Sequence, residues 1–242
     1  MHSDALTFGP LRGFARVDQW LLLWSIAAAT TYFATGGAEL FPGSIAVKAM
    51  SIAPLAILAF RLLRHHDRLL LGGALSASSL GDILLDLPDR YFVHGLLAFL
   101  VAHVLYITLF VRGWPRPLRP RVGQVVLAVL VIAHSALLLA WLAPALGELT
   151  VPATLYSGAL TLMAVTAILA KFTKPIVPFG AILFVVSDSM IAAGRFKTAV
   201  PLAAYLIWAT YYAGQYCIAI GFLRDRLGGD SPPDAPWHVD GT

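Results

Sequence analysis

The sequence contains few charged residues and a single cysteine. Only 12% of its 242 residues are Asp, Glu, Lys or Arg, about half the fraction found in a soluble domain. Cys217 is the sole cysteine, so no disulfide can form within one chain. There is no CxxC pair and no glycine-rich phosphate loop. Hydrophobic residues make up 59% of the chain and its mean hydropathy is +0.78, which is typical of a membrane protein that crosses the bilayer several times.

Long apolar segments recur along the chain. Most approach the ~20 residues that a helix needs to cross a bilayer, and they do not resemble the alternating ~10-residue strands of a membrane β-barrel. Eight transmembrane helices are predicted, at 18–35, 44–60, 68–86, 91–110, 122–142, 150–170, 175–194 and 200–222. The fold class is therefore all-α.

The ends of the chain differ in composition from this core. We expect a cytoplasmic N-terminal segment at 1–17, an eight-helix transmembrane domain at 18–222 and a cytoplasmic tail at 223–242. The tail is rich in Gly, Pro and Asp, which predicts disorder. The Ala-rich end of the first apolar segment also resembles a signal-peptide cleavage site, but the segment has the length of a complete span and is interpreted as a retained helix.

Positive charge is distributed unevenly between the loops on the two sides. One side carries Arg12, Arg16, Arg61, Arg64, Arg68, Arg112, Arg116, Arg119, Arg121, Lys171, Lys174, Arg224 and Arg226. The other side carries Arg90, Arg195 and Lys197. By the positive-inside rule the first side is cytoplasmic, so both termini are expected in the cytoplasm. The membrane is expected to be a bacterial cytoplasmic membrane. The surplus of positive charge reflects topology, so no nucleic-acid partner is expected.

Two aspartates lie inside apolar segments, Asp82 in LLLGGALSASSLGDILLDL and Asp188 in GAILFVVSDSMIAAG. A carboxylate at this depth is costly and is kept mainly where it faces a functional cavity. Asp82 follows Arg68 by 14 residues, and Asp188 follows Lys174 by 14. At about 1.5 Å per residue, both lie roughly 21 Å from the cytoplasmic edge.

Lys48 and Tyr156 come to a similar depth in their own spans. Together with the two aspartates they predict one cavity in the outer half of the membrane. A shared spacing of 106 residues separates Asp82 from Asp188, Tyr106 from Tyr212, and Arg68 from Lys174. This spacing suggests a parallel duplication of two four-helix halves, a known way to build a central membrane site.

At these residues the chain resembles the YhhN family, the lysoplasmalogenases. The segments SSLGDILLDLPDRYFVHGLLAFLVAHVLYI and GAILFVVSDSMIAAGRF look like its two signatures, and TYYAGQYCIAIG is similar to its C-terminal Tyr-Tyr-x-x-Gln pattern. The resemblance covers roughly residues 45–222. It departs from the family in span 2, where Ala49 follows Lys48 and the proline comes later, at Pro54.

This resemblance implies an enzyme that hydrolyses the vinyl ether bond of a lysoplasmalogen to a long-chain aldehyde and glycerophosphoethanolamine or glycerophosphocholine. It implies a lysophospholipid substrate in a lipid membrane, no metal or organic cofactor, and Asp82 and Asp188 as the essential acidic pair. We expect substrate contacts from a further set of polar side chains in the spans. These are Lys48, Tyr156, Tyr212, His103, Ser187 and Gln215.

The chemistry suits two carboxyl groups. Protonation of a vinyl ether at its β-carbon creates an oxocarbenium ion, to which water adds, and the resulting hemiacetal collapses to an aldehyde and an alcohol. One carboxylic acid supplies the proton, and one carboxylate stabilises the cation and activates water, much as in glycosidases. An amphiphilic substrate can enter sideways from the leaflet, with its headgroup at the outer rim.

Two other functions remain open from the residues alone. A zinc-dependent lipid hydrolase would use Asp82, His103, His134 and Asp188 as ligands, although no short His motif is present. A proton-coupled transporter would also contain buried aspartates and a two-fold repeat.

Overall fold

The computed structural model describes residues 15–35, 43–115 and 117–228, which form α-helices without any strand. The helices are α1 (Arg16–Ala34), α2 (Ser44–Leu62), α3 (His65–Leu85), α4 (Phe92–Val111), α5 (Val122–Leu146), α6 (Thr150–Leu169), α7 (Ile176–Phe196) and α8 (Ala203–Gly228). Short 3₁₀ helices precede α4, at Asp89–Tyr91, and α6, at Gly147–Leu149. The predicted all-α class is confirmed.

Each predicted apolar segment corresponds to one of these helices, and the differences lie at the ends. The largest difference is in α8, which continues past residue 222 to Gly228. Its last turns make specific contacts: Asp225 accepts a hydrogen bond from the Thr173 backbone N–H at 2.7 Å, and Arg226 forms an ion pair with Asp67. The remainder of the predicted tail, 229–242, lies outside the described residues.

Seven of the eight helices have the length and apolar composition of membrane spans. Among the described residues, six continuous segments qualify, and one of them, Val122–Leu169, contains both α5 and α6. Helix α1 falls outside these segments. It carries Arg16 and Asp18 in its first turn, which lowers its mean hydropathy. The chain is therefore a multi-pass membrane protein, and an eighth span through α1 stays a prediction.

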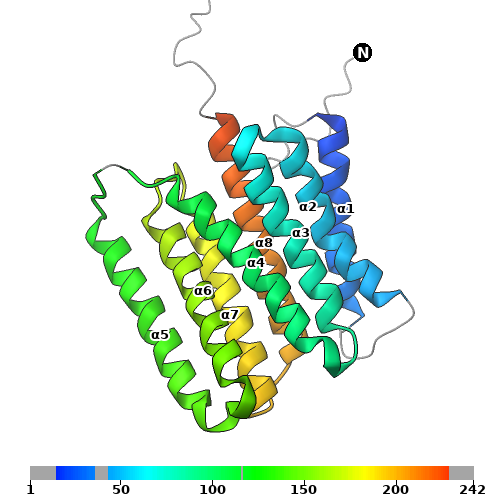
Figure 1. Cartoon of the computed structure of the whole chain (residues 1–242). Coiled ribbons are helices and arrows are strands. Elements are labelled where there is room, and N and C mark those ends of the chain that lie inside the picture. The colour runs from blue at the N-terminus through cyan, green and yellow to red at the C-terminus, as the bar shows by residue number, and fades with distance from the viewer. Residues whose placement is uncertain (1–14, 36–42, 116, 229–242) are drawn as a thin grey trace, which may run out of the picture.

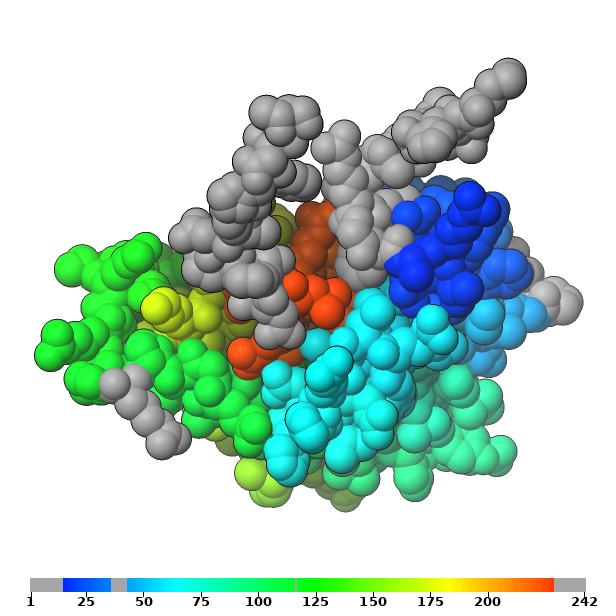
Figure 2. Space-filling view, turned by 90° about the horizontal axis from the view of Figure 1, so that it is seen from above, coloured from blue at the N-terminus to red at the C-terminus, as the bar shows by residue number. Residues whose placement is uncertain are grey.

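The helices form one bundle with α5 at one edge and α1 at the other (Figure 1). Helix α3 packs between α2 and α4, α7 packs against α8, and α4 contacts α6. Helix α8 also contacts α1 and α2, which joins the last helix to the first two. Seen from above, the end of α8 lies between the α1–α3 side and the α5–α6 side (Figure 2).

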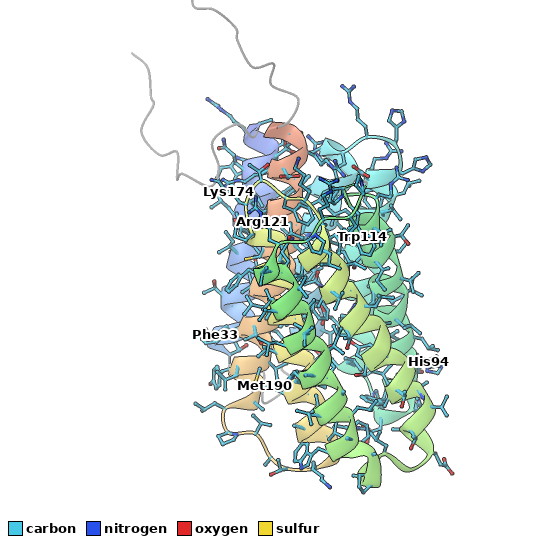
Figure 3. The ribbon with its side chains drawn as sticks, turned by 90° about the vertical axis from the view of Figure 1, so that its left-hand side faces the viewer. Phe33, His94, Trp114, Arg121, Lys174 and Met190 are labelled. Carbon is cyan, nitrogen blue, oxygen red and sulfur yellow. The ribbon has the colours of Figure 1, made fainter. Side chains whose placement is uncertain are left out.

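The basic side predicted from the sequence forms one end of the bundle. Asp67 at the start of α3 lies 3.9 Å from Arg112 at the end of α4 and 3.0 Å from Arg226 in α8. Arg121 and Lys174 lie toward the same end (Figure 3). These contacts connect helix ends that the charge pattern assigns to one side of the membrane.

The opposite end carries fewer charges. There Arg195, at the end of α7, bonds Asp89 before α4 at 3.0 Å. Arg12 and Arg116, two of the residues assigned to the basic side, lie outside the described residues. The proposed four-plus-four repeat is compatible with the paired packing of α3 with α4 and of α7 with α8, but it stays a prediction.

Two glycines allow α7 and α8 to pack backbone to backbone. A Cβ placed on Gly180 would lie 2.6 Å from the carbonyl oxygen of Gly214 and 2.9 Å from the backbone nitrogen of Ile218. A Cβ on Gly214 would lie 2.9 Å from the carbonyl oxygen of Gly180. Small residues at such crossings are characteristic of helix pairs in membranes. This contact fixes the position of α7, which carries Asp188.

Gly180→Ala should therefore destabilise the protein, because the added methyl group meets backbone atoms that cannot move away independently. The expected loss is about 1–3 kcal/mol, the usual range for an overpacked core. Gly194→Ala is the matched control, since it lies on the same helix and a Cβ there meets nothing within 4 Å. Thermal unfolding in detergent measures both variants, and equal midpoints would contradict the close-packing interpretation.

Candidate active site

A cavity of about 220 Å³ lies in the half of the bundle away from the basic end. All eight helices contribute at least one lining residue, and most of the lining side chains are apolar. Arg195, Phe92 and Leu149 line its outer part, whereas Asp82 and Asp188 lie among the polar groups of its wall. Asp82 and Asp188 therefore line the same cavity.

Asp82 is buried on α3, with 3% of its surface exposed. Tyr211 of α8 donates a hydrogen bond to Oδ2 of Asp82 at 2.6 Å. On the other side, Nζ of Lys48 lies 3.9 Å from Oδ1 of Asp82. The adjacent Gly81 lets Phe99 of α4 pack against the α3 backbone, because a Cβ there would be 2.5 Å from the Phe99 ring. These contacts from three other helices fix the position of the carboxyl group.

Asp188 has a similar arrangement on α7. Its Oδ2 accepts a hydrogen bond from the hydroxyl of Tyr156 on α6. The next residue, Ser189, lies 2.9 Å from Nε2 of His134 on α5. Each of the two aspartates therefore has a tyrosine hydroxyl as donor to one carboxyl oxygen, which leaves the second oxygen of each group for other contacts.

Lys48 binds a third carboxylate, Asp86, which lies one turn after Asp82 on the same face of α3. Its Nζ is 2.7 Å from Oδ1 of Asp86, closer than it is to Asp82. Tyr32 of α1 donates to the other oxygen of Asp86 at 3.4 Å, and the Lys48 ammonium lies 5.7 Å from the Tyr32 ring centroid. The ammonium is thus held between two carboxylates.

Four side chains expected to contact substrate do not line the cavity. His103 has no exposed surface and no hydrogen-bond partner among the described residues, and its ring packs edge-on against Tyr156. Ser187 donates to the Ile207 carbonyl at 3.1 Å. Gln215 accepts a hydrogen bond from the Tyr106 hydroxyl at 2.6 Å. Gln215 therefore bonds other side chains behind the cavity, whereas we expected it to contact substrate.

The fourth is Tyr212, whose hydroxyl lies 2.9 Å from Oγ of Ser25 in α1. The adjacent Tyr211 lines the cavity and contacts Asp82. Successive residues on a helix point about 100° apart, and here Tyr211 faces the cavity whereas Tyr212 faces α1. The Tyr-Tyr pair in the sequence pointed to a tyrosine at the site, but the two residues lie at nearly the same depth, which does not show which of them faces the cavity. Tyr32 gave no comparable signal in the sequence.

The zinc ligands considered from the sequence are not gathered. Among the described residues, no group of three or more His, Cys, Asp or Glu side chains is placed to hold a metal ion. His134 contacts Ser189, whereas His103 packs against the rings of Tyr156 and Phe184. The geometry therefore does not support the zinc-hydrolase alternative.

Comparison with known proteins gives consistent relatives. The sequence model of the YhhN family matches residues 43–222. The lysoplasmalogenase of Mycobacterium bovis is 36% identical over 211 residues, covering 84% of this chain and 79% of its own. Lysoplasmalogenase TMEM86A of Bos taurus is 35% identical over 175 residues, covering 68% and 70%. Lysoplasmalogenase TMEM86B of Rattus norvegicus is 30% identical over 228 residues, covering 93% and 92%.

No solved structure matches the chain. The family match begins just before α2 and ends within α8, so it includes the helices that carry Lys48, Asp82, Tyr156, Asp188 and Tyr211. On this match and these identities, the chain belongs to the YhhN family.

Proposed function

We propose that this protein is a lysoplasmalogenase, which hydrolyses the vinyl ether bond of a lysoplasmalogen to a fatty aldehyde and a glycerophospho-headgroup alcohol. One observation carries the proposal: two aspartates inside the bundle, each bonded to a tyrosine hydroxyl, line one apolar cavity in a chain whose relatives are named lysoplasmalogenases. The same relatives argue against the proton-coupled transporter considered from the sequence.

Asp82 and Asp188 can supply both the acid and the base that the reaction needs. A carboxylic acid gives its proton to the β-carbon, the C=C electron pair forms the new C–H bond, and the ether oxygen shares the positive charge. Water then adds to the α-carbon and gives a proton to a carboxylate. The hemiacetal collapses as its hydroxyl proton passes to the departing glycerol oxygen. Acid and base groups positioned in this way typically contribute 10²–10⁴-fold each.

The surroundings of the two aspartates differ, and this suggests their roles. The Lys48 ammonium lies 3.9 Å from Asp82, and an adjacent positive charge favours an ionised carboxylate. Asp188 has the neutral hydroxyl of Tyr156 as its hydrogen-bond partner. We therefore assign Asp188 as the proton donor and Asp82 as the carboxylate that balances the cation and accepts the proton of water.

The substrate phosphate is best placed at Arg195. This side chain lines the outer part of the cavity and bonds Asp89, whose side chain is 86% exposed. Such an exposed ion pair is worth at most about 1 kcal/mol, so a phosphate can replace Asp89 at little cost. Lys48, in contrast, is engaged by two carboxylates and is assigned to positioning Asp82. Lys197 lies near Trp141 and does not line the cavity.

The charge distribution supports an orientation for this arrangement. With the basic end in the cytoplasm, the cavity and Arg195 face the non-cytoplasmic half of the membrane. On this orientation α1 is an eighth span and both termini are cytoplasmic. The site then receives its substrate from the outer leaflet.

Asp82→Asn and Asp188→Asn should each lower the rate by on the order of 10² or more, because an amide neither protonates carbon nor balances a cation. Purified protein is incubated with a lysoplasmalogen and a zinc chelator, and the released aldehyde is measured. A variant that folds and keeps more than about a third of wild-type turnover would exclude the two-carboxylate mechanism.

Loss of wild-type activity on chelation, restored by zinc, would instead favour a metal enzyme.

Tyr211→Phe should lower turnover about 10- to 100-fold, since a hydrogen bond to a charged group contributes about 1.5–3 kcal/mol. Tyr212→Phe is the matched control, because its hydroxyl contacts Ser25 and not the cavity. It should retain turnover within about threefold of wild type. The same aldehyde assay compares them, and equal losses would contradict the assignment of Tyr211 to Asp82.

The proposed orientation is tested by labelling single cysteines in a Cys217→Ser background. Thr198→Cys, in the loop after α7, should react with an impermeant thiol reagent added outside intact cells. Arg119→Cys, in the loop after α4, should react only after the cells are opened. Reversal of this pattern would overturn the orientation.

A further inference from the structure

A second apolar groove, of about 160 Å³, lies between α4 and α6 beside the cavity. Its walls include Leu97 and Leu100 of α4 and Leu155 of α6, and the hydroxyl of Tyr156 is the sole polar side-chain group among its lining residues. Leu96 and Tyr156 line both the groove and the cavity. These two side chains therefore form the boundary between the two spaces.

Tyr156 places this boundary next to the proposed reaction centre. Its hydroxyl bonds Asp188 in the cavity, and the same side chain also lines the groove. When the vinyl ether of a substrate lies at Asp188, the side chain of Tyr156 is therefore what separates the reacting atoms from the groove.

Among the described residues, large buried side chains close the cavity toward the basic end. On the basic-end side of the lining residues Phe99, Leu160 and Val185, the interior is filled by large side chains with no exposed surface. These are His103, Tyr106, Met163 and Phe184. A long chain attached to a vinyl ether at the aspartates therefore has to leave the bundle sideways.

The cavity is also small for a whole lysophospholipid. Its volume of about 220 Å³ is below the ~300–1,000 Å³ typical of pockets for drug-sized ligands. On the groove side, Leu97 is 53% and Leu155 is 62% exposed, so the groove opens directly onto the surface that faces lipid. A chain that lies there keeps its outer part in the hydrocarbon of the bilayer.

We propose that the α4–α6 groove is the binding site for the hydrocarbon chain of the lysoplasmalogen substrate. The proposal rests on the function proposed above. The headgroup lies toward Arg195, the vinyl ether lies at Asp82 and Asp188, and the chain passes Leu96 and Tyr156 into the groove. After hydrolysis the aldehyde leaves through the groove into the bilayer, and the glycerophospho alcohol leaves through the outer mouth.

The test narrows the groove without disturbing the packed core. Leu97→Trp and Leu155→Trp add bulk at exposed groove positions. The matched controls are Val104→Trp on α4, which is 53% exposed in the wild type, and Leu162→Trp on α6, which is 50% exposed. Neither control position lines the groove or the cavity. All four variants are assayed for aldehyde release from a long-chain lysoplasmalogen and from a short-chain analogue with the same headgroup.

The groove variants should lose about tenfold or more in kcat/KM on the long-chain substrate, the scale on which a hydrophobic pocket discriminates chains. They should stay near wild type on the short-chain analogue, and the controls should stay near wild type on both. Equal effects on the two substrates, or equal effects of control and groove variants, would overturn the groove assignment. If the wild-type protein released aldehyde from neither substrate, the proposed function itself would fail.

A photoreactive lysophospholipid with a diazirine near the end of its chain gives a second measurement that does not depend on turnover. It should label the α4 and α6 residues that line the groove, and Leu155→Trp should reduce this labelling. Labelling confined to α5, whose leucines line the opposite part of the cavity, would place the chain there and overturn the proposal.

Discussion

Two carboxyl groups inside an apolar bundle, one buried and one half-buried, impose the main constraint on this structure. A carboxylate left without partners in such surroundings costs several kcal/mol, so the fold has to bring polar groups to each one. Asp82 on α3 receives Tyr211 from α8 and Lys48 from α2, and Asp188 on α7 receives Tyr156 from α6. These contacts require α3 to lie near α8 and α7 near α6, which the close packing of the bundle achieves.

Behind these contacts lies a second layer of hydrogen bonds that joins α4 to α8. Tyr106 donates to Oε1 of Gln215, and Nε2 of Gln215 lies 3.4 Å from the hydroxyl of Tyr211, which in turn donates to Asp82. Gln215 therefore orients Tyr211 and affects the Asp82 carboxylate only through that tyrosine. This accounts for a glutamine with no exposed surface at a position that does not line the cavity.

The sequence was sufficient for those features that depend on position along the chain. Hydropathy located all eight helices, and counting residues from the basic loops placed Asp82, Asp188, Lys48 and Tyr156 at one depth, where the structure has them lining one cavity. The sequence did not predict features that depend on the rotation of each helix about its axis or on which helices pack together. The depth of a residue in the membrane does not specify which way its side chain points.

The choice of Tyr212 over Tyr211 illustrates this limit, since the two residues differ by one position and face different helices. The Lys48–Asp86 pair joins two helices and needed their packing to be known. His103 illustrates it as well: at the expected depth it packs against aromatic rings behind the cavity and has no polar contact in the described part of the chain.

Helix α1 lies outside the residues matched by the family, which begin at 43, yet it forms part of the site. Its Tyr32 lines the cavity and bonds Asp86, and its Ala29 carbonyl accepts a hydrogen bond from Trp208 of α8 at 2.9 Å. The wall of the site thus combines helices inside the family match, which hold both aspartates, with one helix that precedes the match. A substitution at Tyr32 would therefore alter the cavity wall and the surroundings of Asp86 without replacing either Asp82 or Asp188.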